Sequence, residues 1–409
     1  MALPPFTAVN QPLPMPQRSA APATPALTGL PVLRLGFRPF YLGAALLACL
    51  AIPLWVAVFR GWVSLPLAIS PTLWHAHEML YGFAVGVIVG FLLTAVKAWT
   101  GLQTPRGPLL GGLFLLWLAA RVAALGAPYG LYALLDMLLL PAVAISLLRV
   151  LIQAGNKRNI PLISLLLLMA VANAVFHLSA LGWLALPALH ALYAELAMVI
   201  MVVSVITGRV VPMFTKNVTP GLVIKVSRRF ELSLLALTAL ALLLWVCAAP
   251  AALAGSALAI AALLHALRLA SWKPWVTLGR PILWILHLAY AWLPLGLALL
   301  ALAQWGWLAP SLGVHALGVG VVGGLIIGML TRTARGHTGR PLQPSRAETL
   351  AYSLVLLAAV VRVLLPMLQP SWYVMALDAA ACLWAVAFAI YLFIYTPWLT
   401  RTRLDGKDG

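Results

Sequence analysis

WHAHEMLYGFAVGVIVGF, residues 74–91, begins with two histidines and a glutamate and continues as an almost unbroken apolar run. A run of this length crosses the hydrocarbon core of a membrane as one helix. His75 and Glu78 are three residues apart, so they share one face of that helix. The same face continues into Gly82, Gly86 and Gly90. We therefore predict a membrane-spanning helix with a polar end and a stripe of small residues that lets a neighbouring helix approach closely.

The composition is that of a protein built almost entirely of such segments. Of its 409 residues, 64% are apolar and 8% are charged, and the mean hydropathy is +1.03, far outside the range of soluble domains. The stretches near the required 20 residues cover approximately 41–59, 73–96, 109–126, 129–152, 160–184, 187–211, 231–249, 251–269, 281–304, 310–332, 347–367 and 371–396. We predict an all-α, polytopic membrane bundle of about twelve transmembrane helices.

The basic residues predict the orientation of these helices. Cytoplasmic loops are enriched in lysine and arginine, and most of the 26 basic residues fall in the two tails and in every second loop. Both termini are therefore predicted to be cytoplasmic, with a flexible tail over 1–33, a membrane domain over 34–398 and a second tail over 399–409. The first tail lacks the apolar core of a cleaved signal. The net charge of +18 has no aromatic-basic module around it, so topology and anionic membrane lipid explain it better than nucleic acid.

This orientation places five of the eight histidines in the outer leaflet. They are His75, His77, His190 and His315, which begin inward-running segments, and His177, which ends an outward-running one. A single interfacial histidine is more often structural, but imidazoles gathered at one depth favour a metal or haem site. These five are our candidate metal ligands. Glu78 and Glu195 are candidate acceptors for the N–H groups of the ligating imidazoles.

Two arginines and two further histidines are candidates for binding a cofactor. Arg209 and Arg332 lie at the inner ends of their segments, where a guanidinium can hold a carboxylate such as a haem propionate. Arginines at the inner ends cannot reach a haem that is bound by the outer histidines. They could bind its propionates if the haem lies near the middle of the membrane, or if its ligands are His265 and His287 on the cytoplasmic side. Anchoring at the membrane surface is the simpler explanation of both arginines. No C-x-x-C-H motif occurs, so any haem is predicted to be non-covalent.

Parts of the chain repeat. Aligning His77 with His315 superimposes Gly82, Gly86 and Gly90 on Gly320, Gly324 and Gly328, and Thr100-Gly101 on Thr338-Gly339, without a gap. The next two segments also correspond: Arg121 and Asp136 flank one outer turn, and Arg362 and Asp378 flank another. We predict that each of these pairs forms a buried ion pair, which is structural or supports the metal ligands from outside. The segment led by His190 is a weaker third copy, which suggests three four-helix units.

Several motifs together resemble the NnrS family. They are LGFRPF (35–40), WHAHEMLYGF (74–83), FLLTAV (91–96) with WTG (99–101), GRVVPMFT (208–215), and MLTR (329–332) with GHTGRP (336–341). They extend over nearly the whole membrane region. Lys97 and Ala98 depart from the uncharged residue and asparagine expected before WTG, and neither is a candidate ligand.

The resemblance implies a multi-pass protein of the bacterial cytoplasmic membrane that contains haem and copper. It implies a part in the response to nitric oxide and protection from nitrosative stress, commonly alongside denitrification. It implies no settled reaction, ligand set or electron donor, so the ligands named above rest on depth and spacing.

Two other classes of function stay open. One is a haem–copper enzyme of the nitric oxide reductase type, for which adjacent His-His ligands and a soluble electron-entry domain are missing from the sequence. The other is a transporter of a metal, a metal–nitrosyl complex or a small anion, with which repeated glycine-rich helices are compatible.

Overall fold

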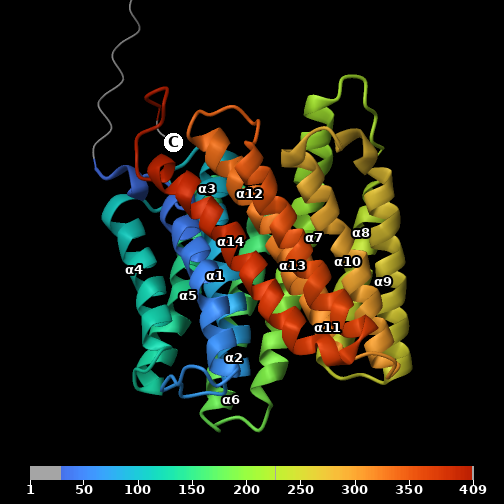
Figure 1. Cartoon of the computed structure of the whole chain (residues 1–409). Helices are drawn as coiled ribbons and strands as arrows, with labels where there is room; N and C mark the ends of the chain where they lie inside the picture. The colour runs from blue at the N-terminus through green and yellow to red at the C-terminus, as the bar shows by residue number, and fades with distance from the viewer. Residues whose placement is uncertain (1–28, 226, 408–409) are drawn as a thin grey trace, which may run out of the picture.

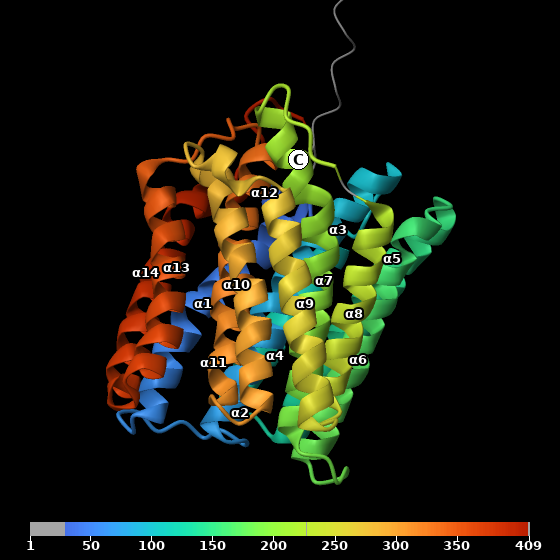
Figure 2. The same ribbon diagram turned by 90° about the vertical axis from the view of Figure 1, so that its right-hand side faces the viewer.

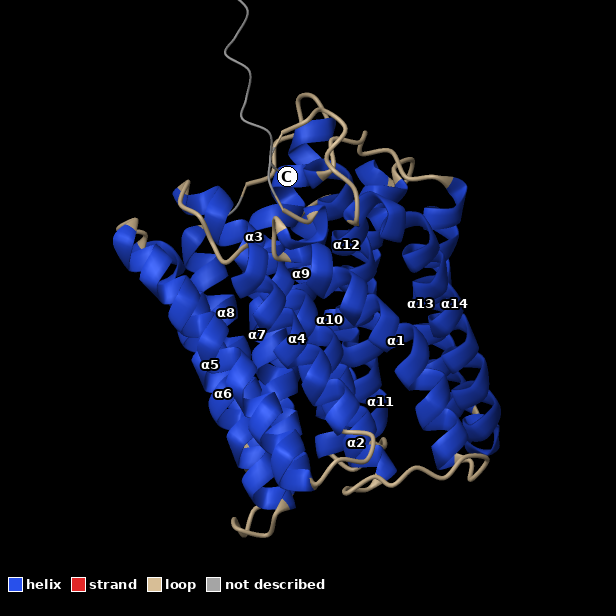
Figure 3. Cartoon of the chain, turned by 90° about the vertical axis from the view of Figure 1, so that its left-hand side faces the viewer, coloured by secondary structure: helices blue, strands red, loops and turns tan. Residues whose placement is uncertain are grey.

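The chain folds as a bundle of helices joined by short loops (Figures 1 and 3). The computed structural model describes residues 29–407 except residue 226, and this part contains no strand. Its first half contains α1 (Phe37–Phe59), α2 (Pro71–His77), α3 (Val85–Thr100), α4 (Gly107–Ala123), α5 (Tyr129–Gln153), α6 (Ile160–Ala180) and α7 (Ala188–Val218). Its second half contains α8 (Arg228–Val246), α9 (Ala251–Ser271), α10 (Pro281–Gln304), α11 (Pro310–His315), α12 (Gly324–His337), α13 (Arg346–Leu368) and α14 (Tyr373–Leu399).

The predicted all-α membrane fold is confirmed. Among the described residues, 11 helical segments are long and apolar enough to cross a membrane. The one predicted span that is missing from these 11 is α4, whose 17 residues reach the lower limit of length for a transmembrane helix. The protein is therefore a multi-pass membrane protein, and exposed apolar side chains such as Leu115 and Phe393 give it a surface suited to lipid. Most of the predicted tail over 1–33 lies outside the described residues.

Two composite spans are the most buried of the bundle. These composite spans, Pro71–Thr100 and Pro310–His337, each consist of two α-helices with a π segment between them. In the most apolar stretch of each, 72% of the residues are buried, compared with 67% in α10. Their glycines explain the close packing, because a Cβ added at Gly90 would lie 2.9 Å from the Cβ of Phe40, and one at Gly324 would lie 2.7 Å from that of Ala289. The predicted glycine stripe therefore brings α1 against one composite span and α10 against the other. Figure 2 shows α12 beside α10.

The two composite spans share an unusual backbone. Each starts with a proline at its first helical position, and each changes from α- to π-helix directly after the aligned histidine, through η2 (Glu78–Ala84) and η5 (Ala316–Gly323). Both end at a left-handed glycine, Gly101 with φ 73° and Gly339 with φ 74°. The third predicted copy differs, because α7 is a continuous α-helix that runs past Gly208 to Val218. The three-unit repeat thus stays a prediction, supported by two of its members.

The two described ends of the chain meet on one face of the bundle, at the top of Figure 1. There the Arg38 guanidinium donates to the carbonyl oxygens of Leu399, at 2.9 Å, and Arg401, at 2.7 Å. This is the face that the basic residues predict to be cytoplasmic. The candidate ligands His75, His77 and His315 lie at the opposite ends of their spans, on the face predicted to be outer.

Candidate functional site

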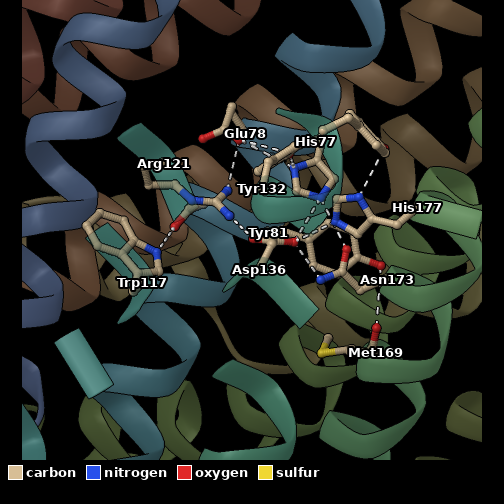
Figure 4. Close-up of polar contacts among 12 residues, drawn as sticks. His77, Glu78, Tyr81, Trp117, Arg121, Tyr132, Asp136, Met169, Asn173 and His177 are labelled. Atoms are coloured by element: carbon tan, nitrogen blue, oxygen red, sulfur yellow. Dashed lines mark hydrogen bonds and ion pairs between the residues drawn. The ribbon is translucent and has the colours of Figure 1, made fainter. Parts of the chain in front are cut away.

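Three side chains from three helices converge toward the face of the bundle that is predicted to be outer. His77 is the last residue of α2, Asp136 lies on α5 and His177 on α6. The Nε2 atoms of His77 and His177 lie 3.2 and 3.1 Å from Asp136 Oδ2. One potential ligand atom from each residue lies within 4.8 Å of the other two, and all three side chains are buried. We call these residues the His77 cluster (Figure 4).

A closed network of polar side chains holds the His77 cluster in place. The Tyr132 hydroxyl lies 2.8 Å from His77 Nδ1, and the Tyr129 hydroxyl lies 3.0 Å from His177 Nδ1. Each imidazole therefore has its Nδ1 engaged and turns its Nε2 toward Asp136. The Asn173 amide donates to Asp136 Oδ2 at 2.6 Å. This is the pattern of an outer ring that orients ligating imidazoles and carboxylates.

The charges around the His77 cluster do not balance. Arg121 pairs with Asp136 and also donates to Glu78 Oε1 at 3.0 Å, so one guanidinium faces two buried carboxylates. With neutral imidazoles, one negative charge remains in a site of low dielectric, where an uncompensated charge is costly. A bound cation would offset that charge. The donor set, two imidazoles and a carboxylate, suits copper(II) and iron(II).

The other two outer histidines of the composite spans face each other across a cavity. The rings of His75 and His315 are nearly parallel, with 10° between their planes and 6.5 Å between their centroids. Imidazoles bind metals at about 2.0–2.1 Å, so two rings sharing one metal ion have centroids about 6 Å apart. The cavity has a volume of about 300 Å³. We call it the His75–His315 cavity.

The walls of the His75–His315 cavity are mostly apolar. They include Trp55, Phe83, Tyr193 and Trp384, together with residues of both π segments. π segments inside α-helices occur frequently at functional sites. The ring of Trp55 stacks on His75 with 4.0 Å between centroids, and among the described residues His75 has no hydrogen-bond partner. Both ring nitrogens of His75 are thus available to a ligand.

His315 has the orientation expected of a ligand. Its Nδ1 donates to the Ser311 carbonyl oxygen at 2.7 Å, which leaves the Nε2 lone pair as the acceptor. The guanidinium of Arg362 lies 3.3 Å from that Nε2. Arg362 is 5% exposed and meets no carboxylate among the described residues, although its cation faces the Tyr373 ring.

The prediction that Arg362 pairs with Asp378 is therefore wrong. Asp378 pairs instead with Arg60, at 2.6 Å, in a half-exposed contact. The reason is the packing of α14, which lies along α1 as well as α13, so that Asp378 faces the end of α1. The first pair, Arg121 with Asp136, forms as predicted, with Glu78 as a third member.

The remaining candidate residues do not belong to these two sites. His190 contacts the ring of Tyr193. The buried Glu195 lies beside Tyr81, whose ring stacks on His77, so this carboxyl group borders the His77 cluster without belonging to it. His265 bonds Tyr290 and Thr238, at 2.6 and 3.0 Å, and His287 bonds Thr215 at 3.0 Å.

Arg209 and Arg332 lie together near the predicted cytoplasmic face. Both line a second, larger cavity, which also includes His337. Neither arginine ends its helix as expected, because α7 continues to Val218 and α12 to His337. His265 and His287 do not line this cavity.

Sequence reasoning did not count Asp136, the central residue of the His77 cluster, among the ligands, because it had assigned this residue to an ion pair with a structural or supporting role. One signal could have found it. Asn173 and His177, four residues apart, lie on one face of α6, and Asp136 contacts both. Tyr129 and Tyr132 had no distinguishing signal, since tyrosine is common at membrane interfaces.

Comparison with known proteins agrees with this architecture. A sequence model of the NnrS family, described as NnrS protein, matches residues 31–403, which is nearly the whole chain. No curated protein matches the chain. The match covers both composite spans, the His77 cluster and both cavities. The chain belongs to the NnrS family.

Proposed function

We propose that this protein is a haem- and copper-binding protein of the nitric oxide response in the bacterial cytoplasmic membrane. It binds or processes nitric oxide, or protects against nitrosative stress. The observation that carries the proposal is the buried His77 cluster, with two imidazoles and a carboxylate around one point and one uncompensated negative charge. Membership of the NnrS family supports the choice of haem and copper.

The two sites fit different cofactors. Neither cavity includes a residue of the His77 cluster, so this cluster can accept an ion but not a macrocycle. Its nitrogen and oxygen donors fit copper. The His75–His315 cavity has two facing imidazoles, aromatic walls and the guanidinium of Arg362, which fit the iron, the ring and a carboxylate of haem. When bound, haem would supply an iron that takes nitric oxide as a ligand.

Metal analysis tests the first assignment. The double variant His77→Ala and His177→Ala, purified as the full chain, is expected to lose about one copper or iron ion per chain, because it removes two of three donors. His190→Ala is the control, since that histidine lies outside the cluster. Circular dichroism and size exclusion verify the fold. An unchanged metal content in a folded double variant would rule out the cluster as the metal site.

Optical spectroscopy tests the second assignment. We expect a Soret band in the purified protein that shifts when nitric oxide is added, and that is lost in both His75→Ala and His315→Ala. His337→Ala is the matched control, because His337 lines the other cavity. Loss of the band in His337→Ala alone would place haem in the larger cavity. A protein without a Soret band that takes up metal in liposomes would support transport instead.

A further inference from the structure

A second cavity lies at the predicted cytoplasmic ends of three central helices. Its volume is about 730 Å³, and it is lined by parts of α3, α7 and α12 and by the loops near them. Within the described part of the chain its lining includes no aspartate or glutamate and four arginines: Arg158, Arg209, Arg332 and Arg403. We call it the arginine cavity. It shares no residue with the His77 cluster or the His75–His315 cavity.

Arg332 is the most informative of the four. It is 9% exposed, and its guanidinium lies 3.6 Å from the centroid of the Phe214 ring. Within the described part of the chain it makes no hydrogen bond and no ion pair. A guanidinium has five N–H donors, and those of Arg332 border the cavity without an acceptor from the described residues. A ligand with acceptor oxygens would satisfy these donors.

Three other buried arginines of the bundle meet carboxylates, and Arg332 differs from them. Arg121 meets Asp136 and Glu78, Arg268 meets Glu231, and Arg335 meets Glu348. (These contacts lie in three different parts of the fold.) Arg332, only three residues before Arg335, meets none. Among the described residues, Arg332 shares this lack of a carboxylate with Arg362, and both arginines line a cavity.

The other walls of the arginine cavity are consistent with an amphiphilic ligand. Arg209 donates to Asn159 Oδ1 at 2.9 Å and is otherwise open at the mouth, while Arg403 pairs with Asp405 at 2.6 Å. Apolar side chains continue the wall from Trp99 to Phe91, Ile206, Met213 and Met329. The lining of the cavity thus offers both cations and apolar surface.

We propose that the arginine cavity binds a ligand that carries two phosphate groups, held by Arg332 and Arg209. Guanidiniums bind phosphate through paired, charge-assisted hydrogen bonds. Basic pockets between transmembrane helices on the cytoplasmic side bind anionic lipid headgroups. The same chemistry is offered by a diphosphate lipid and by a soluble diphosphate, and the two are distinguished by experiment.

Binding to the purified full chain in uncharged detergent tests this proposal, with two probes. One is short-chain cardiolipin and the other is inorganic pyrophosphate, each titrated by calorimetry. At least one probe is expected to bind, with its Kd raised tenfold or more in Arg332→Gln and also raised in Arg209→Gln. The probe that binds more tightly identifies the lipid or the soluble source. Arg332→Lys keeps the charge but loses the paired N–H donors of the guanidinium. Its Kd is expected to lie between those of the wild type and Arg332→Gln.

Arg346→Gln is the matched control, because this exposed arginine lies on the same face outside the cavity. Its Kd for either probe is expected to equal that of the wild type. Absence of binding by both probes would overturn the proposal. So would an equal loss in Arg346→Gln, which would mean that the whole basic face attracts the anion. Metal and Soret measurements on the same samples separate this result from the cofactor assignments.

Discussion

The two composite spans have the same backbone and different chemistry. In each, a short α-helix ends at the aligned histidine, a π segment follows, and a glycine stripe leads to a left-handed glycine. Yet His77 lies in a closed network with Asp136 and His177, whereas His315 borders a cavity opposite His75. Similar segments therefore place imidazoles in one site rich in carboxylates and in another whose described lining contains none.

The neighbours account for this difference. The first composite span lies near α5 and α6, which supply Asp136, Asn173 and His177. The second packs against α10 and α13, which supply apolar side chains and Arg362. An internal repeat can thus fix where a histidine lies in depth, while the adjoining helices decide which ligand it can bind.

Removing the arginine of each site should give the largest contrast. Arg121→Ala leaves Asp136 and Glu78 buried without their cation and is expected to cost about 3–5 kcal/mol of unfolding free energy. Arg362→Ala removes a guanidinium that has no carboxylate partner among the described residues, and should cost about 1 kcal/mol. Denaturant unfolding in detergent measures both. Equal losses would show that the two sites do not differ in charge as described.

The aligned glycines should give an intermediate effect. A Cβ at Gly90 would lie 2.9 Å from the Phe40 Cβ, which is fixed to the backbone, whereas one at Gly328 would lie 2.8 Å from Leu286 Cδ2, the end of a flexible side chain. Gly90→Ala is expected to cost about 1–3 kcal/mol and Gly328→Ala less. Thermal unfolding measures the difference. Gly112→Ala is the control, since an added Cβ there has no neighbour within 4 Å; a similar loss in this variant would refute the packing argument.

The aspartate that aligns with Asp136 should matter least. The pair of Arg60 with Asp378 has side chains 29% and 36% exposed, and such pairs contribute about 0–1 kcal/mol. A double-mutant cycle with Arg60→Ala and Asp378→Asn, repeated at high salt, measures the coupling. A coupling well above this range would mean that Asp378 is as strongly paired as Asp136.

Periodicity and charge predicted most of the fold, because the length of apolar runs and the positions of basic residues are set by the membrane. The same reasoning predicted the Arg121–Asp136 pair, since both lie near one helix hairpin. It failed for Arg362 because the partner of Asp378, Arg60, is distant in sequence. Contacts between helices that are not consecutive are not encoded in spacing along the chain.

The candidate sites were only partly predictable for the same reason. Depth identified His75, His77, His177 and His315, but not which of them meet. The prediction that His75 and Glu78 share a face assumed an α-helix, whereas the backbone becomes π-helical at Glu78. His75 therefore lines the cavity while Glu78 joins Arg121 and His77.

The π segments have a consequence for how each span is oriented about its own axis. One residue of an α-helix corresponds to a rotation of about 100°. A π segment between the histidines and the glycine stripe changes the rotation per residue. The direction in which the histidines point about the helix axis is therefore set separately from the direction in which the glycines point. In such a span the imidazoles can point toward a ligand while the glycines still face the neighbouring helix. Ligand geometry and packing between helices are thus adjusted independently within one span.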